Sequence, residues 1–182
     1  MDNKDRYHLI IFTGAGVSKE SNIPTFSSKP WMRFKLTRSY ANKHPEEYAK
    51  VIAEFVQGIA GKEPNAAHHA IAELNVPVLT MNVDNLHQKA GSNWVINLHG
   101  SLPDQLILYG DKAPAYTEAI RLVKRLMFGN SYFLIIGVSG FTAISGQLEK
   151  IAKQRRAKII KINDKAGIKV PEFLNRIRKN IQ

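Results

Sequence analysis

The sequence predicts an α/β protein with a mostly parallel sheet and helices on both of its faces. Two observations support this fold class. Short apolar runs alternate with helical patterns along most of the 182 residues, as in chains of parallel βαβ units. The first apolar run, within residues 9–18, is uninterrupted, as in a strand buried on both faces, and leads directly into a glycine turn.

The glycine turn Gly14-Ala15-Gly16 is the first candidate binding element. Two glycines permit positive φ angles and a close approach of the backbone to a ligand such as a dinucleotide phosphate. Ser18, with Glu20 after it, is predicted to open a helix whose free N–H groups face the pyrophosphate. The third glycine of the usual fingerprint is missing, so the turn alone is also compatible with a purely structural role.

The next elements are justified by composition and periodicity. Residues 21–27 are too polar and proline-marked for a strand or helix interior and are predicted to form a loop. Residues 45–60 show helical spacing, with proline and glutamates at the start and glycines at the end. A second helix is predicted over residues 64–74, followed by a buried strand over residues 76–80.

The second half continues the alternation. Strands are predicted over residues 94–98, 106–109, 132–136 and 158–162, because each is a short apolar run. Helices are predicted over residues 116–128 and 144–156, and a last helix is predicted to begin at Pro171. The strand over residues 132–136 ends in a second glycine turn.

Polar residues follow two of the predicted strands. Asn82 and Asp84 come after residues 76–80, and His99 comes after residues 94–98. Open α/β sheets bind ligands at the carboxyl ends of their strands, so these side chains are site candidates. Taken singly, a histidine after a strand and an aspartate before a helix are more often structural.

Charge and composition limit the classes of binding partner that the protein could have. The net charge is +11, from 26 Lys and Arg against 15 Asp and Glu, and the cations crowd the C-terminal part. This charge permits nucleic-acid binding, but no nucleic-acid-binding motif favours it. The chain has no cysteine and no apolar run near the roughly 20 residues that span a bilayer. We therefore expect a cytoplasmic protein with no membrane partner and no signal peptide.

Several motifs occur in a characteristic order: Gly14-Ala15-Gly16-Val17-Ser18, Ile23-Pro24-Thr25-Phe26, Pro64-Asn65-Ala66-Ala67-His68, Asn82-Val83-Asp84, Leu86-His87, Leu98-His99-Gly100, Tyr109-Gly110-Asp111, Gly137 with Ser139, and Ile162-Asn163. In this order the chain resembles the sirtuins, a family of NAD-dependent protein deacylases. The resemblance implies a Rossmann-like sheet, NAD as co-substrate and an acyl-lysine protein or peptide as partner. It also implies one domain over residues 1–182, with a large NAD-binding part at 1–26 and 62–182 and a reduced helical subdomain at about 27–61.

The resemblance also implies roles for single residues. His99 is the implied general base, and Asn82 is the second implied catalytic residue. Asp84 is implied to accept a hydrogen bond from the nicotinamide carboxamide. The implied cofactor contacts are Gly14, Ala15, Gly16 and Ser18 at the phosphates and ribose, Pro24 and Phe26 in the cofactor loop, Asn82, Val83 and Asp84 at the nicotinamide, and Gly137, Ser139 and Asn163 at the adenosine half.

The chain departs from the sirtuin pattern at four places. A typical sirtuin carries a zinc module with four cysteines after the position of Gly100, where this chain has Ser101 alone. A zinc–thiolate site is thereby excluded, and no metal is expected. Ser27, Met81 and Asp111 stand where the family usually has arginine, glutamine and glutamate. The first two changes are expected to weaken NAD binding.

Three functions remain open at this point. The first is NAD-dependent lysine deacylation. In this family the acyl-lysine peptide is implied to add as a strand beside Tyr109-Gly110 and the segment after Ser139. The second is an NAD glycohydrolase or ADP-ribosyltransferase, which the reduced peptide-binding module favours. The third is a non-catalytic module that binds NAD or ADP-ribose, because fold resemblance alone does not determine function.

Overall fold

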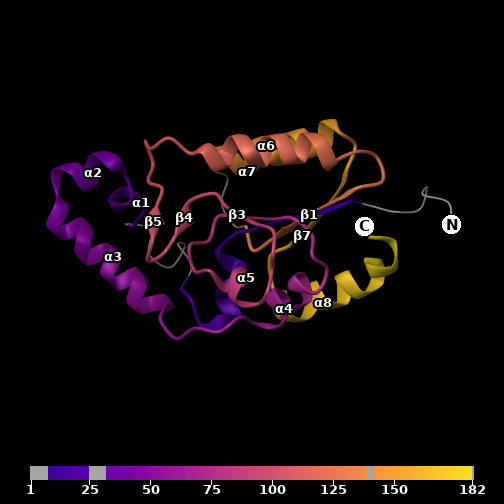
Figure 1. The fold of residues 1–182 in the computed structure, drawn as a ribbon, viewed down its shortest axis with the longest axis horizontal. Coiled ribbons are helices and arrows are strands. Elements are labelled where there is room, and N and C mark those ends of the chain that lie inside the picture. The colour runs from indigo at the N-terminus through magenta and orange to yellow at the C-terminus, as the bar shows by residue number, and fades with distance from the viewer. Residues whose placement is uncertain (1–7, 25–31, 139–141, 182) are drawn as a thin grey trace.

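Five parallel strands form the centre of the protein in a computed structural model (Figure 1) that describes residues 8–24, 32–138 and 142–181. In spatial order the strands are β3 (Val95–Asn97), β2 (Val78–Thr80), β1 (Leu9–Thr13), β6 (Tyr132–Ile136) and β7 (Lys158–Ile162). The predicted parallel sheet is confirmed. The strand predicted over residues 106–109 is wrong except at Leu106. The observed strand β5 (Gln105–Leu106) pairs antiparallel with β4 (Gly100–Ser101) outside this sheet.

Eight α-helices and two 3₁₀ helices are assigned in the described ranges. They are η2 (Ala15–Ser21), α1 (Met32–Lys35), α2 (Arg38–Lys43), α3 (Pro45–Ile59), α4 (Ala66–Ala72), α5 (Leu86–Lys89), α6 (Pro114–Leu126), α7 (Ala143–Gln154), α8 (Ala166–Ile177) and η4 (Arg178–Asn180). The helices predicted over residues 45–60, 64–74, 116–128 and 144–156 are confirmed as α3, α4, α6 and α7, with ends that differ by a few residues.

Two predicted helix starts are wrong. The helix after the glycine turn is a 3₁₀ helix that begins at Ala15, so Ser18 lies inside it and does not open it. The last helix begins at Ala166 and contains Pro171 in its interior. Ala166 and Val170 are buried in the core, and their packing outweighs the backbone hydrogen bond that a proline removes.

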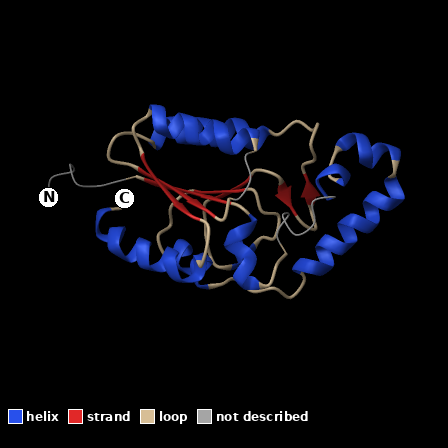
Figure 2. Ribbon diagram, turned by 180° about the vertical axis from the view of Figure 1, so that it is seen from behind, coloured by secondary structure: helices blue, strands red, loops and turns tan. Residues whose placement is uncertain are grey.

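Helices cover both faces of the sheet (Figures 1 and 2). On one face, Leu9 and Ile11 of β1 pack with residues of α4 and α8. On the other face, Ile10 and Phe12 pack with residues of α6 and α7. Because successive side chains of a strand point to opposite faces, a strand covered on both sides must be apolar throughout, as the sequence of β1 is.

A separate apolar cluster joins α2 and α3 at one end of the molecule (Figure 1). Its buried members are Leu36, Ala41, Val51 and Leu108. The Thr37 hydroxyl accepts a hydrogen bond from the Tyr40 amide and so caps α2. Leu108 lies outside residues 27–61 but packs in this cluster. The subdomain boundary at residues 27–61 therefore stays a prediction.

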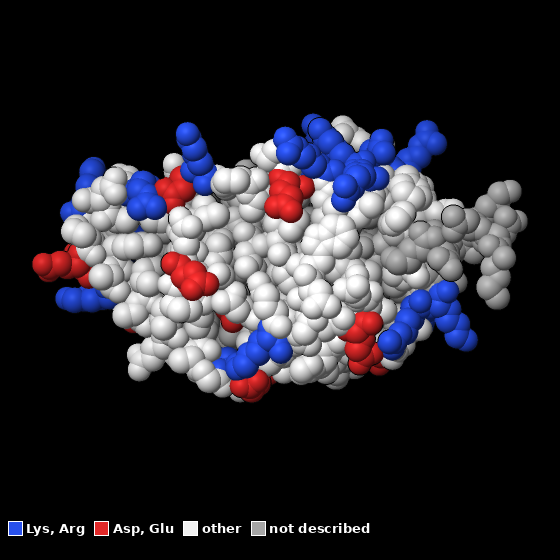
Figure 3. All heavy atoms as spheres, in the orientation of Figure 1, with Lys and Arg blue, Asp and Glu red and all other residues white. Residues whose placement is uncertain are grey.

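Lys and Arg side chains gather over α6 and α7 (Figure 3). Arg121, Lys124 and Arg125 are exposed on α6. The charge permits nucleic-acid binding, which the sequence does not favour. Among the described helices, none combines the length and apolar character needed to cross a bilayer.

Candidate functional site

The carboxyl ends of the five parallel strands bring the predicted site residues to one edge of the sheet. Gly14 follows β1, Asn82 lies two residues after β2, and His99 lies two residues after β3. Gly137 and Asn163 directly follow β6 and β7. Since Thr80 pairs with Asn97 across β2 and β3, Asn82 and His99 leave the sheet at the same level.

Glycines allow the turn after β1 to touch the turn after β6. The Gly16 amide donates to the Gly137 carbonyl at 2.9 Å. A Cβ added to Gly16 would lie 2.6 Å from Gly137 Cα, and Gly137 has a φ of 64°. The Gly14 amide also donates to a backbone carbonyl, that of Ile136, at 3.0 Å. These glycines therefore allow the two turns to pack closely against each other. The sequence pattern had suggested that the glycines allow a ligand to approach the backbone.

Ser18, Asn82 and Asp84 form a hydrogen-bonded cluster at this edge. Asn82 Nδ2 donates to Ser18 Oγ at 3.0 Å, and Ser18 Oγ donates to Asp84 Oδ2 at 2.7 Å. Asp84 Oδ1 accepts from the Leu86 amide at 3.0 Å. Burial raises the pKa of Asp84, while the Leu86 amide and the Ser18 hydroxyl act in the opposite direction. The cluster thus holds one half-buried carboxyl group in a defined orientation.

A second polar layer, which sequence reasoning did not identify, lies behind this cluster. Thr13 Oγ1 donates to Thr80 Oγ1 at 2.8 Å and lies 3.0 Å from His87 Nε2. The His87 and His68 rings are 4.8 Å apart. Burial, with a smaller contribution from a neighbouring histidine, lowers the pKa of His87 to about 3 and the pKa of His68 to about 4. Both rings are therefore neutral near pH 7. Thr13 and Thr80 end buried strands, and His68 and His87 lie on α4 and α5 within two of the quoted motifs, but nothing in the sequence indicated that these four side chains meet.

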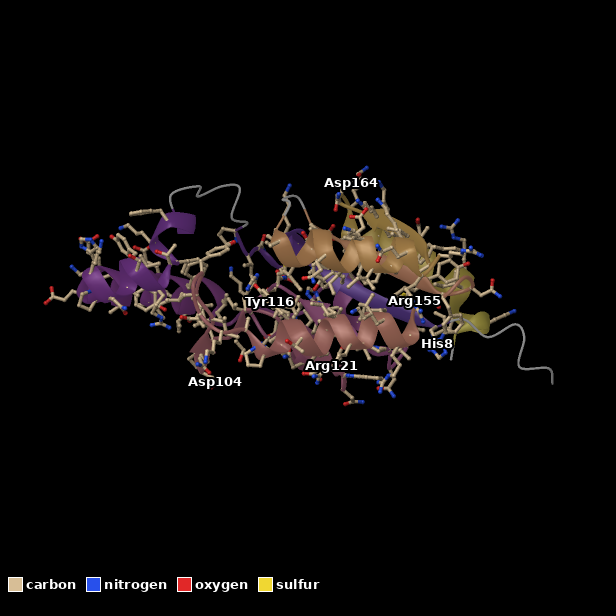
Figure 4. The ribbon with its side chains drawn as sticks, turned by 90° about the horizontal axis from the view of Figure 1, so that it is seen from above. His8, Asp104, Tyr116, Arg121, Arg155 and Asp164 are labelled. Carbon is tan, nitrogen blue, oxygen red and sulfur yellow. The ribbon has the colours of Figure 1, made fainter. Side chains whose placement is uncertain are left out.

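His99 is half-buried and contacts a residue that the sequence analysis treated only as part of a helix. Burial lowers the pKa of His99, so its imidazole is neutral near pH 7. Its Nδ1 lies 3.1 Å from Tyr116 Oη. Tyr116 lies in the first turn of α6, at the end of that helix nearer to α1–α3 (Figure 4). The Ile107 amide donates to the His99 carbonyl at 2.9 Å and fixes the backbone there.

The other predicted contacts are more dispersed. Ala15 and Val83 are half-buried, whereas Pro24 and Asn163 are exposed. Phe26 and Ser139, with the divergent Ser27, lie outside the described residues. Met81 is half-buried and packs against the α6/α7 core, and its Sδ accepts from Thr142 Oγ1 at 3.5 Å.

The segment that was expected to pair with a peptide already makes backbone hydrogen bonds. The Tyr109 amide donates to the Leu36 carbonyl at 3.1 Å, and the Arg38 amide donates to the Tyr109 carbonyl at 2.9 Å. The Leu108 amide donates to Asp111 Oδ2 at 2.9 Å. Asp111 also forms a two-point ion pair with Arg38, at 2.7 and 2.8 Å. An added strand at Leu108 or Tyr109 would have to break one of these bonds.

Residues 8–24, 32–138 and 142–181 contain no group of three or more His, Asp or Glu placed to hold a metal ion. The whole chain lacks cysteine.

Known proteins resemble both the sequence and the fold. A family model described as the Sir2 family matches residues 14–120. NAD-dependent protein deacylase 2 of Pyrobaculum aerophilum is 30% identical over 203 residues, which cover 86% of this chain and 79% of that protein. The NAD-dependent protein deacetylase of Thermodesulfovibrio yellowstonii is 36% identical over 132 residues, covering 66% of this chain and 52% of that protein. The chain therefore matches about half the length of the second relative.

Solved structures agree with these relatives. A Sir2 homologue mutant in complex with ADP ribose has a TM-score of 0.85 and 27% identity, and the match covers 98% of this chain and 97% of that one. A Sir2 homologue in complex with NAD has a TM-score of 0.83 and 28% identity, covering 94% and 90% of the two chains. With a family model over more than half of the sequence and the same fold, this chain belongs to the Sir2 family.

Proposed function

We propose that this chain is an NAD-dependent protein deacylase, which removes an acyl group from a lysine side chain and releases nicotinamide. The observation that carries the proposal is the Ser18–Asn82–Asp84 cluster at the ends of neighbouring strands, with His99 at the end of the next strand. Membership of the Sir2 family and relatives named NAD-dependent protein deacylase support it.

The donors and acceptors of the cluster suit a carboxamide. Asp84 accepts one hydrogen bond at each carboxylate oxygen, and a carboxylate has further acceptor positions for an amide NH₂ group. We assign Asn82, Val83 and Asp84 to the nicotinamide side of the site. When bound, NAD supplies the nicotinamide–ribose bond whose cleavage releases nicotinamide.

The remaining cofactor residues are assigned by their place at the strand ends. Gly14, Ala15, Gly16 and Ser18 are proposed at the phosphates and the adjacent ribose. On the adenosine side we propose Gly137, Ser139 and Asn163, and in the cofactor loop we propose Pro24 and Phe26. The acyl-lysine peptide is proposed to bind between the reduced helical subdomain and the large part, beside Tyr109-Gly110 and the segment after Ser139, without a zinc module.

His99 is proposed to act as the general base. A general base must be unprotonated before it reacts, and the burial that lowers the pKa of His99 favours its neutral form. In this role Nε2 of His99 accepts a proton from a hydroxyl group of the sugar. Asn82 is proposed to assist catalysis by holding the Ser18–Asp84 pair in place through its side-chain amide.

The test compares His99→Ala with the wild-type protein. We expect deacetylation of an acetyl-lysine peptide to fall by about 10²- to 10⁴-fold, the usual contribution of a general base. NAD binding, measured by calorimetry, should change little because the Ser18–Asn82–Asp84 cluster is intact. The control is His69→Ala, an exposed residue of α4. A His99→Ala protein that deacetylates at the wild-type rate would exclude His99 as the base.

A further inference from the structure

His99, in the turn after β3, and Tyr116, in the first turn of α6, form a side-chain pair. Tyr116 Oη lies 3.1 Å from His99 Nδ1, which is within hydrogen-bond range. The two rings meet edge to face, with centroids 5.8 Å apart and an interplanar angle of 72°. Because Nδ1 is hydrogen-bonded to Tyr116, Nε2 is the ring nitrogen that is left to contact a substrate.

Both partners are held by buried or hydrogen-bonded structure. Ala119 and Val123, one and two turns beyond Tyr116 on α6, are fully buried against the sheet. On the other side, the His99 carbonyl accepts from the Ile107 amide. Gly100 has a φ of 79° and packs closely on the Gln105 backbone. The contact is therefore made between a hydrogen-bonded turn and a helix that is packed on the sheet, which favours a single geometry.

The direction of this hydrogen bond decides whether His99 can act as a base. A neutral imidazole carries one proton, on Nδ1 or on Nε2, and the hydrogen bond at one nitrogen selects the tautomer. If Tyr116 donates to Nδ1, the ring proton is on Nε2, and that nitrogen has no lone pair for a substrate proton. If Nδ1–H donates to Tyr116 Oη, the lone pair lies on Nε2.

We propose that Tyr116 is a positioning residue that accepts a hydrogen bond from Nδ1–H of His99 and so keeps the proton-accepting lone pair on Nε2. The proposal rests on the role of His99 under "Proposed function". Burial lowers the pKa of His99, and burial together with Tyr109 raises the pKa of Tyr116. Near pH 7 the pair therefore consists of a neutral imidazole and a neutral phenol, as a hydrogen bond in either direction requires, and the direction follows from the role of His99 as the base.

The experiment compares histidine tautomers in the wild type, Tyr116→Phe and Tyr109→Phe. Long-range ¹H–¹⁵N correlation spectra distinguish Nδ1–H from Nε2–H, and His99→Gln identifies the His99 signals among those of the six histidines. Tyr116→Phe keeps the ring and removes only the hydroxyl. Tyr109→Phe is the matched control, because its ring also faces His99, with centroids 6.5 Å apart.

In the wild type we expect His99 to carry its proton mainly on Nδ1. Loss of one hydrogen bond in Tyr116→Phe should shift the Nδ1–H to Nε2–H ratio roughly two- to tenfold toward Nε2–H, and Tyr109→Phe should leave the ratio unchanged. A wild-type protein with its proton mainly on Nε2, or an unchanged ratio in Tyr116→Phe, would overturn the proposal.

Kinetics then separates this inference from the proposed function. In an active enzyme, kcat of Tyr116→Phe should fall in proportion to the fraction of His99 that carries its proton on Nδ1, while KM for NAD stays constant. An unchanged kcat with a lowered Nδ1–H fraction would overturn the link to catalysis. The spectra are recorded on the resting protein. If no deacylation is found but the ratio shifts, the proposed function fails while the placement of the His99 proton by Tyr116 stands.

Discussion

The contact between Gly16 and Gly137 gives a prediction that is sensitive to a single methyl group. In Gly16→Ala the new Cβ would lie 2.6 Å from Gly137 Cα and 2.9 Å from its carbonyl oxygen. Both neighbours are backbone atoms, so a rotamer change cannot relieve the overlap. Overpacking of this kind costs about 1–3 kcal/mol of folding free energy. The turn must move away from β6, and Ser18, two residues further along, should move with it and weaken NAD binding.

Urea unfolding and NAD calorimetry test this prediction together. In thermal unfolding, each 1 kcal/mol of lost folding free energy would lower Tm by about 2–4 °C for a chain of this size. The control is Gly58→Ala in α3, where an added Cβ meets no described atom within 4 Å, so the variant should gain about 0.5–1 kcal/mol from the better helix former. If Gly16→Ala is as stable as the wild type and binds NAD equally well, the close glycine contact does not organise the site.

Further predictions concern charge, pH and metal. Asp84→Asn should weaken inhibition by nicotinamide about ten- to hundredfold through loss of a charge-assisted hydrogen bond; undiminished inhibition of an active variant would exclude Asp84 from the nicotinamide pocket. Because the folded-state pKa values of His68 and His87 lie below the unfolded value near 6.5, stability should be full above pH 6.5. It should fall toward pH 4 by up to about 1.4 kcal/mol per pH unit for each histidine. Equal urea midpoints at pH 7.5 and 5.5 would contradict neutral burial. Treatment with EDTA should leave Tm and deacetylation unchanged, and a lower Tm would reveal a metal site.

The parts of the fold that depend on local pattern could be predicted from the sequence. The apolar run in β1 and the alternation of strands with helices were sufficient for the parallel sheet, because burial on both faces requires that pattern. The start of α8 could not be predicted in this way. Pro171 is a strong local signal, but tertiary packing of Ala166 and Val170 extends the helix in front of it.

The candidate site was predictable in part, since strand ends could be located but contacts across the chain could not. Asn82, Asp84 and His99 follow apolar runs, and parallel topology brings such ends to one edge. Tyr116 comes from the first turn of a helix, and no periodicity distinguishes a tyrosine that touches His99 from one that faces solvent. The contact of Gly16 with Gly137 likewise joins segments that are distant in sequence.

The most direct test of the central claim is nicotinamide release from NAD by the wild-type protein, with and without an acetyl-lysine peptide. Deacetylated peptide is followed by mass spectrometry in the same samples. We predict that release requires the peptide and that one nicotinamide forms for each peptide deacetylated. Equal release without peptide would contradict deacylation and indicate a glycohydrolase. Absence of release from protein that binds NAD would identify a non-catalytic binding module.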